Sequence, residues 1–267
     1  MKLSKRLERV AAFAAGRSQI PAEKTKELPA HDTVCPLRIA DIGTDHGYVP
    51  IALALENPDL QALALDVRPG PLKRAEEHIA RYGLQARIRT RLSDGASALR
   101  PGEADVIIIA GMGGELILHI LEGGRHLWPF TDRWILSPQS ELSKVRRYLK
   151  AQNFTITRED LVEEDDKYYP IIEAVHGRVP GIPEDLPVPD EAFEEVRCLY
   201  GPRLIEQKHP VLLRLLRREE TKLTAILNQL KTRSTEKART RSQELNRQLA
   251  YITRAIKEIT LPDKDSK

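Results

Sequence analysis

Residues 37–56 read LRIADIGTDHGYVPIALALE, and this segment defines the first unit of the fold. Residues 37–42 form a short apolar run that ends at a glycine, which predicts a buried strand. The residues near 48–56 are predicted to be helical. A strand, a glycine-containing loop and a helix together form the first unit of a parallel sheet with helices on its faces.

The same alternation continues along the chain. Strands are predicted at 60–66, 87–92, 105–111 and 133–138, and helices near 70–82, 113–122 and 140–150. The segments 154–160 and 168–177 follow without a helix between them, so we expect an antiparallel pair on one edge of the sheet. The fold class is therefore α/β, with a doubly wound, mostly parallel Rossmann-like sheet.

Helical segments flank this domain. Residues 2–15 have the apolar spacing of an amphipathic helix that ends at Gly16, and four prolines in 178–190 mark a linker. Beyond it, Leu245 begins an apolar series with 4-3-4-3 spacing, which favours an antiparallel helical hairpin and leaves a parallel dimeric coiled coil open. We expect three parts: an N-terminal helix at 1–16, an α/β domain at 37–178, and a helical domain at 190–260.

The composition excludes several classes of protein. Of 267 residues, 41% are hydrophobic and 30% are charged, which argues against wholesale disorder. Apolar runs such as 106–110 are far shorter than the roughly 18 residues of a membrane span. Two cysteines make neither a disulfide framework nor a structural zinc site, and the N-terminus lacks a secretory pattern. We expect a cytoplasmic protein without a metal.

Charge is distributed unevenly along the sequence. Basic residues predominate near both ends, and acidic residues predominate in 159–195. This pattern is typical of a protein with a polyanionic partner, although solvated helical faces would produce it as well.

The first candidate site is the loop after the first predicted strand. Asp41 and Asp45 flank Gly43 there, and the glycine spacing differs from the pattern that cradles a pyrophosphate. Two acids repel phosphates and suit a cationic ligand with an amino group, such as S-adenosylmethionine. An ordinary turn between a strand and a helix is the alternative interpretation.

Two further acids end the next two predicted strands. Asp66 lies 23 residues after Gly43, a spacing that suits hydrogen bonds from ribose hydroxyls, although a helix cap is the alternative. Asp94, followed by Gly95, could accept a hydrogen bond from an adenine amino group, or form a common turn.

A glycine cluster follows the fourth predicted strand. Gly111, Gly113 and Gly114 leave an open floor on which a flat base could lie, although a tight turn explains one or two of them. The Asn/Asp-Pro-Pro-aromatic motif usual in exocyclic adenine methyltransferases is absent from the sequence. Tyr168 could stack on an extruded base or pack in the core.

The series LSKRL, ADIGTDHGYVP, LDVRPGPL, LSDG, IIIAGMGGELI and DKYYPI, in this order, resembles the bacterial TrmK-like family. The resemblance covers residues 3–176 and implies methyl transfer from S-adenosylmethionine to N1 of adenine 22 in tRNA. It makes 37–178 a methyltransferase domain and 190–260 an RNA-binding domain. Two departures stand out: the linker at 16–36 is long, and Ser137-Pro138-Gln139 replaces a frequent Gln-Pro-Asn.

The resemblance also implies roles for individual residues. The cofactor would be bound by Asp41, Gly43, Asp45, His46, Asp66, Asp94, Gly95, Gly111 and Met112. The substrate would contact Arg6, Gly113, Gly114, Pro138 and Tyr168. Asp45 is the candidate catalytic residue, because the methylated base is a cation that a nearby carboxylate stabilises.

We therefore expect a tRNA methyltransferase that acts as a monomer, with a dimer left open. A small-molecule methyltransferase with the same cofactor site and a non-catalytic RNA-binding protein are the alternatives. The basic helical ends argue against the small-molecule interpretation, and the intact crevice motifs argue against the non-catalytic one.

Overall fold

The computed structural model describes residues 1–16, 36–182, 190–231 and 235–262, and the chain divides into two compact units, Met1–Glu184 and Asp185–Lys267. Most of the linkers expected at 16–36 and 178–190, together with Cys35, lies outside the described residues. The connection between the two long helices of the expected hairpin, at 232–234, lies outside them as well. Among the described helices, none is long and apolar enough to cross a membrane.

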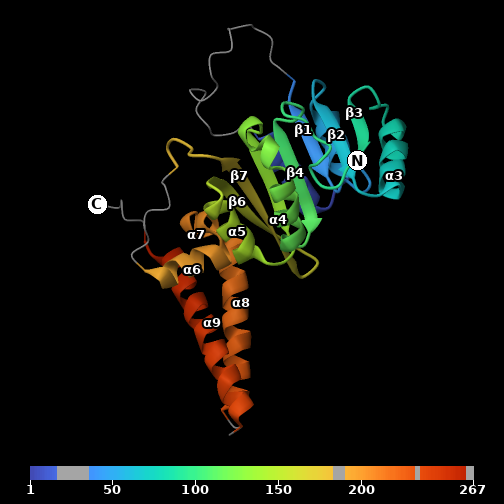
Figure 1. The fold of residues 1–267 in the computed structure, drawn as a ribbon. Helices are drawn as coiled ribbons and strands as arrows, with labels where there is room; N and C mark the ends of the chain where they lie inside the picture. The colour runs from blue at the N-terminus through green and yellow to red at the C-terminus, as the bar shows by residue number, and fades with distance from the viewer. Residues whose placement is uncertain (17–35, 183–189, 232–234, 263–267) are drawn as a thin grey trace. The chain divides into compact units, whose positions relative to one another are not determined.

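Seven strands of the first unit form one sheet in the order β3-β2-β1-β4-β5-β7-β6 (Figure 1). Five of them are parallel: β1 (Arg38–Ile42), β2 (Gln61–Asp66), β3 (Ile88–Leu92), β4 (Val106–Met112) and β5 (Arg133–Pro138). β7 (Lys167–His176) pairs antiparallel with β5 and with β6 (Phe154–Glu164). The predicted doubly wound sheet with an antiparallel edge pair is confirmed.

Helices cover both faces of this sheet, because its central strands are buried on both sides. One hydrophobic cluster joins the sheet to α1 (Lys5–Ala15), α2 (Tyr48–Glu56) and α3 (Pro69–Arg81). The opposite cluster joins it to α4 (Gly114–Gly123) and α5 (Leu142–Ala151). Side chains of β4 alternate between the two, with Ile108 in the first and Ile107 and Ile109 in the second.

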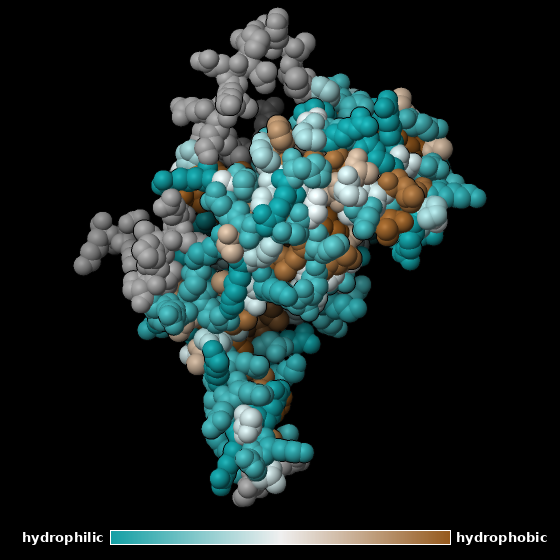
Figure 2. Space-filling view, in the orientation of Figure 1, coloured by the Kyte–Doolittle hydropathy of each residue, from teal (hydrophilic) through white to brown (hydrophobic). Residues whose placement is uncertain are grey.

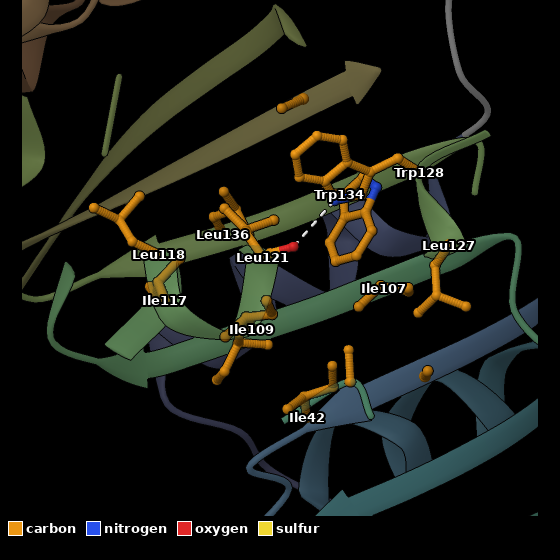
Figure 3. Close-up of a cluster of buried hydrophobic side chains, with 14 of the residues drawn as sticks. Ile42, Ile107, Ile109, Ile117, Leu118, Leu121, Leu127, Trp128, Trp134 and Leu136 are labelled. Atoms are coloured by element: carbon orange, nitrogen blue, oxygen red, sulfur yellow. Dashed lines mark hydrogen bonds between the residues drawn. The ribbon is translucent and has the colours of Figure 1, made fainter. Parts of the chain in front are cut away.

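The cluster on the α4–α5 face contains both tryptophans (Figure 3). Trp134 is fully buried, and the Trp128 indole donates a hydrogen bond to the Leu121 carbonyl at 3.1 Å. Trp128 belongs to a 3₁₀ helix, Arg125–Phe130, which the sequence did not predict. Such a helix lacks the 3.6-residue apolar period, and Pro129 inside it disfavours an α-helix.

Buried arginines fix α1 and the edge strands to the sheet. The Arg133 guanidinium donates to the carbonyls of Phe13 and Ala14, at 3.0 and 3.2 Å, and lies 3.3 Å from Glu173. These carbonyls belong to the last turn of α1, which leaves them without partners inside the helix. The basic N-terminal helix is therefore a built-in part of the first unit.

The second unit is helical. It consists of α6 (Glu191–Tyr200), α7 (Pro202–Glu206), α8 (Pro210–Leu230) and α9 (Glu236–Thr260). α8 and α9 lie side by side (Figure 1), and in the face drawn in Figure 2 they present mainly hydrophilic residues. Leu245, Ile252 and Ile259, seven residues apart, are the buried members of the α9 series, whereas Leu249 and Ile256 are half-buried.

Candidate functional site

The chain reverses its direction of winding between β1 and β4. The helices that follow these two neighbouring strands, α2 and α4, pack on opposite faces of the sheet. In open parallel sheets, ligands bind in the crevice at the carboxyl ends of such a strand pair. A cavity lies there, lined by Arg6, Leu7, Val10, Asp41, Gly43, Thr44, Asp45, His46, Tyr48, Val49, Ala110, Gly111 and Ser137.

Asp41 is the buried charge of this cavity. It lies in β1, and its carboxylate accepts a hydrogen bond of 2.7 Å from the Thr44 hydroxyl. Burial raises its pKa from 3.8 to about 6, the Thr44 hydrogen bond opposes this rise, and the nearby charge of Asp66 adds to it. Within the described part of the chain, no basic side chain pairs with Asp41. The site therefore presents an acid that lacks a cation.

The loop after β1 approaches β2 and β4 closely. The Gly43 and Thr44 amides both donate to the Leu65 carbonyl, and Gly43 has a φ of +75°. A side chain at position 43 would collide with the Met112 methyl group, which occupies the space that a Cβ would need. The structure thus brings together Gly43 and Met112, two predicted cofactor residues from different strands.

Asp45 differs from Asp41 in both exposure and partners. It also lines the cavity, but its exposed carboxylate lies 2.8 Å from the Arg74 guanidinium of α3 and 3.4 Å from His46 Nε2. The His46 ring stacks on Tyr48 and on His78, with ring centroids 5.1 and 5.5 Å apart. His46 Nδ1 is buried and has no hydrogen-bond partner among the described residues.

The remaining predicted acids lie at the ends of β2 and β3, outside the cavity lining. Asp66 is buried and accepts a hydrogen bond from the Arg68 amide at 3.0 Å, whereas Asp94 is exposed. Val67 and Leu92 are more than half exposed beside them, and Leu92 pairs with Asp66 across the strands. This apolar pair was not predicted from the sequence, although Val67 directly follows Asp66 and Leu92 lies two residues before Asp94.

The predicted glycines have different structural roles. Gly111 lines the cavity with a φ of +79° and open space around it. Gly95 allows α4 to approach, since a Cβ there would lie 2.9 Å from Ile120. Gly114 is buried, and a Cβ there would lie 2.6 Å from the Ser140 carbonyl. This packing does not fit the prediction that Gly114 faces a base, and Ser140 Oγ also lies over Gly113.

The predicted substrate residues are only partly gathered. Arg6 lines the cavity, with its guanidinium 5.0 Å from the centre of the Tyr169 ring. Tyr168 instead donates to Glu163 at 3.0 Å, because neighbouring residues of a strand point to opposite faces. Pro138 is buried, and the preceding Ser137 lines the cavity while donating to the Pro170 carbonyl at 2.9 Å.

No group of histidine, cysteine or acidic side chains in the described ranges could hold a metal ion. The cavity instead offers one unpaired buried carboxylate, an exposed carboxylate and glycines of positive φ, and the flexible Met112 side chain lies against one of these glycines, Gly43. These features suit an organic cation whose amino group reaches Asp41 and whose flat parts lie against backbone.

Comparisons with known proteins place these features in a family. A family model described as TrmK, tRNA (adenine(22)-N(1))-methyltransferase, matches residues 39–254. Over 261 residues, 96% of this chain and 98% of the relative, the chain is 30% identical to the tRNA (adenine(22)-N(1))-methyltransferase of Bacillus subtilis (strain 168).

Solved structures agree with this match. Streptococcus pneumoniae Sp1610, in complex with S-adenosyl-L-methionine, has a TM-score of 0.73 at 28% identity, covering 96% of this chain and 100% of that chain. M. capricolum TrmK, in complex with S-adenosyl-homocysteine, has a TM-score of 0.71 at 25% identity, covering 97% and 100%.

Proposed function

This chain belongs to the TrmK family of tRNA (adenine(22)-N(1))-methyltransferases, and from that premise we propose how its own residues perform the reaction. The enzyme uses S-adenosylmethionine to methylate N1 of adenine 22 in tRNA. The roles proposed for individual residues rest mainly on one observation. The Asp41 carboxylate is buried where the sheet reverses its winding, and, among the described residues, no cationic side chain pairs with it.

Asp41 would bind the ammonium group of the cofactor. Its Thr44 partner occupies one lone pair and leaves the others available, and its raised pKa reports a charge that the free protein does not neutralise. Gly43 and Gly111 would let the backbone approach the cofactor, and Met112 would lie over it. Neutralisation of a buried carboxylate then contributes binding energy.

Asp66 would accept hydrogen bonds from the ribose hydroxyls, and Asp94 with Gly95 would bind the adenine end. The exposed Val67 and Leu92 side chains support this placement, since they offer apolar surface to a flat ring beside both acids. His46, held by its ring contacts, would form the wall between the two ends of the cofactor.

The target base would enter from the side of α1 and β5. Arg6, Gly113 and Pro138 remain the proposed base contacts, and Tyr169, whose ring lies beside Arg6, takes the place proposed for Tyr168. The position of Arg6 in the cavity wall supports its role best. Adenine must leave its stack to expose N1 here, which costs a few kcal/mol.

The protein contributes to this reaction mainly by orienting the two reactants and by stabilising charge. S-adenosylmethionine supplies an electrophilic methyl group on a sulfonium. Adenine N1 carries an in-plane lone pair, so no residue has to remove a proton before attack, and orientation dominates the rate. The methylated base is cationic, and Asp45 would stabilise that charge. The positive charge of Arg74 partly offsets the negative charge of Asp45, so this ion pair would set how strongly Asp45 stabilises the methylated base.

The second unit would bind the tRNA backbone with its basic residues, leaving cofactor binding to the first unit. The parts expected at 1–16, 37–178 and 190–260 stay a proposal about roles: α1 packs within the first unit, and the division of the chain near residue 184 supports a separate role for 190–260. We propose further that the enzyme acts as a monomer without a metal in the cytoplasm.

A tRNA transcript with 1-deazaadenine at position 22 tests the proposal. The analogue keeps the shape of adenine and replaces N1 with C–H. Wild-type enzyme should transfer a tritiated methyl group from S-adenosylmethionine to the unmodified transcript and not to the analogue. Equal transfer to both transcripts would place the reaction at another atom.

A further inference from the structure

A second cavity adjoins the crevice between the N-terminus and α3. Its volume is about 460 Å³, and its wall includes Met1 to Ser4 together with Arg81 and Tyr82 at the end of α3. In Figure 1 the N-terminus lies beside α3. Arg6, Leu7 and Tyr48 line both cavities. A polymer with one residue in the crevice could therefore place the next residue here.

The charge of this second cavity is one-sided. Lys2, Arg6 and Arg81 line it, and no aspartate or glutamate does. Among the described residues, no carboxylate pairs with Lys2 or Arg81, and Arg6 contacts the Tyr169 ring instead. Three cations without carboxylate partners favour an anion, and the phosphate of a nucleic acid is the anion that basic side chains most often hold in such interfaces.

Exposed aromatic rings stand beside these cations. Tyr48 and Tyr82 are 38% and 39% exposed, although both line the cavity. Tyr48 already stacks on His78 with centroids 5.2 Å apart and planes 15° apart, so the wall contains parallel rings. Rings next to unpaired cations form the usual binding site for one splayed nucleotide, because the base stacks while the phosphate is neutralised.

We propose that this cavity binds a nucleotide adjacent to the target adenine, with Tyr82 stacking on its base and Arg81 and Lys2 neutralising its phosphate. The inference rests on the proposed function, because it needs a flipped adenine in the neighbouring crevice. It assigns the residues that hold the strand beside that adenine. Binding there opposes the return of the adenine to its stack, so it lowers the cost of flipping.

Two variants and two matched controls test this inference. Tyr82→Leu removes the ring and Arg81→Gln removes the charge. Phe130→Leu and Arg100→Gln change exposed side chains in the segments that precede β5 and β4, outside the lining of either cavity. Initial rates are measured with an unmodified tRNA and with tRNAs carrying an abasic site on the 5′ or the 3′ side of the target adenine.

We expect Tyr82→Leu to raise the KM for tRNA about 5- to 150-fold, the range of one base–aromatic stack, without changing the Kd for S-adenosylmethionine. With one of the two abasic tRNAs, the KM of the wild-type enzyme should rise by a similar factor. For Tyr82→Leu, the KM for that abasic tRNA should equal its KM for the intact tRNA. Arg81→Gln should reduce the slope of log KM against log salt by about one phosphate contact. The controls should match the wild type.

Wild-type KM values for both Tyr82→Leu and Arg81→Gln would overturn the inference. The inference would also fail if Tyr82→Leu raised the KM by the same factor for the intact tRNA and for both abasic tRNAs. If Tyr82 stacks on a base, removing that base must abolish the effect of removing the ring. A wild-type enzyme that methylates no tRNA would contradict the proposed function instead, and S-adenosylmethionine binding would then show whether the crevice is intact.

Discussion

Replacing Asp41 with asparagine should stabilise the cofactor-free enzyme and weaken its binding of S-adenosylmethionine. Asparagine has nearly the same shape and can still accept the hydrogen bond from Thr44, but it cannot ionise. The two effects have opposite signs because the free protein buries a carboxylate whose charge only the cofactor would neutralise.

The pKa of Asp41 gives the size of the stability effect. The pKa is about 6 in the folded protein, against an ordinary value of 3.8 for an aspartate, a difference of about 2 units. The folded state binds the proton more tightly, so the free energy of unfolding falls as pH rises between these values. The cost is about 3 kcal/mol at pH 7 and about half of that at pH 5.

The asparagine variant avoids this cost. Its melting temperature without cofactor should exceed that of the wild type by roughly 6–12 °C at pH 7, since about 1 kcal/mol corresponds to 2–4 °C in a domain of this size. The difference should shrink by about half at pH 5. Loss of a hydrogen bond to a charged group should raise the Kd for S-adenosylmethionine about 10- to 150-fold.

Differential scanning fluorimetry and isothermal titration calorimetry measure the two effects. Asp59→Asn is the matched control, because it makes the same change at an exposed position before β2. The proposed role of Asp41 fails if Asp41→Asn melts no higher than wild type at pH 7, or if it binds S-adenosylmethionine with wild-type affinity. Asp59→Asn should change neither quantity.

Four other perturbations have defined outcomes. The wild-type Kd for S-adenosylmethionine should rise about tenfold from pH 7 to pH 5 by calorimetry, because protonation of Asp41 removes its charge; a flat profile would contradict its role. Asp66→Ala should abolish methyl transfer while leaving tRNA binding in a gel-shift assay unchanged; retained activity would refute the ribose contact. Deleting residues 190–267 should preserve cofactor binding and remove tRNA methylation, and full activity would reject the proposed division of roles. Arg133→Met should lower the free energy of unfolding by about 1–3 kcal/mol in urea titrations, because the Ala14 carbonyl loses its donor and Glu173 keeps only Arg158 of its two arginine partners; an unchanged free energy of unfolding would argue against that anchor.

The strands of the first unit could be predicted because their signal is local. Ile107, Ile108 and Ile109 form an uninterrupted apolar run, which only a strand buried on both faces accommodates in an α/β pattern. The antiparallel edge followed from the absence of a connecting helix. The 3₁₀ helix at Arg125–Phe130 could not be predicted, since six residues without a period carry no comparable signal.

The candidate site was predictable in its residue types and less so in its contacts. The positions of Asp41 and Asp66 at neighbouring strand ends follow from the sheet alone. The partner of Asp45, Arg74, is 29 residues away and depends on how α3 packs. The role of Gly114 could not be predicted either. In the sequence, a glycine that leaves space for a bound base looks the same as a glycine that lets a neighbouring carbonyl pack closely.

The choice between Tyr168 and Tyr169 turned on strand register. Neighbouring residues of β7 face opposite sides, and the pairing of β7 with β5 and β6 decides which tyrosine approaches Arg6. A shift of one residue would exchange the two rings. Sequence periodicity did not fix that register, so the structure was needed to identify Tyr169.

Primer extension on an unmodified tRNA is the most direct test of methylation at adenine 22 through an Asp41-bound cofactor. The tRNA is incubated with S-adenosylmethionine and either wild-type enzyme or Asp41→Asn, at a cofactor concentration well below the Kd of the variant. A methyl group on N1 blocks the pairing edge, so wild-type enzyme should produce a single strong stop at adenine 22 and the variant a much weaker one. A stop at another position, or equal stops with both enzymes, would contradict this mechanism.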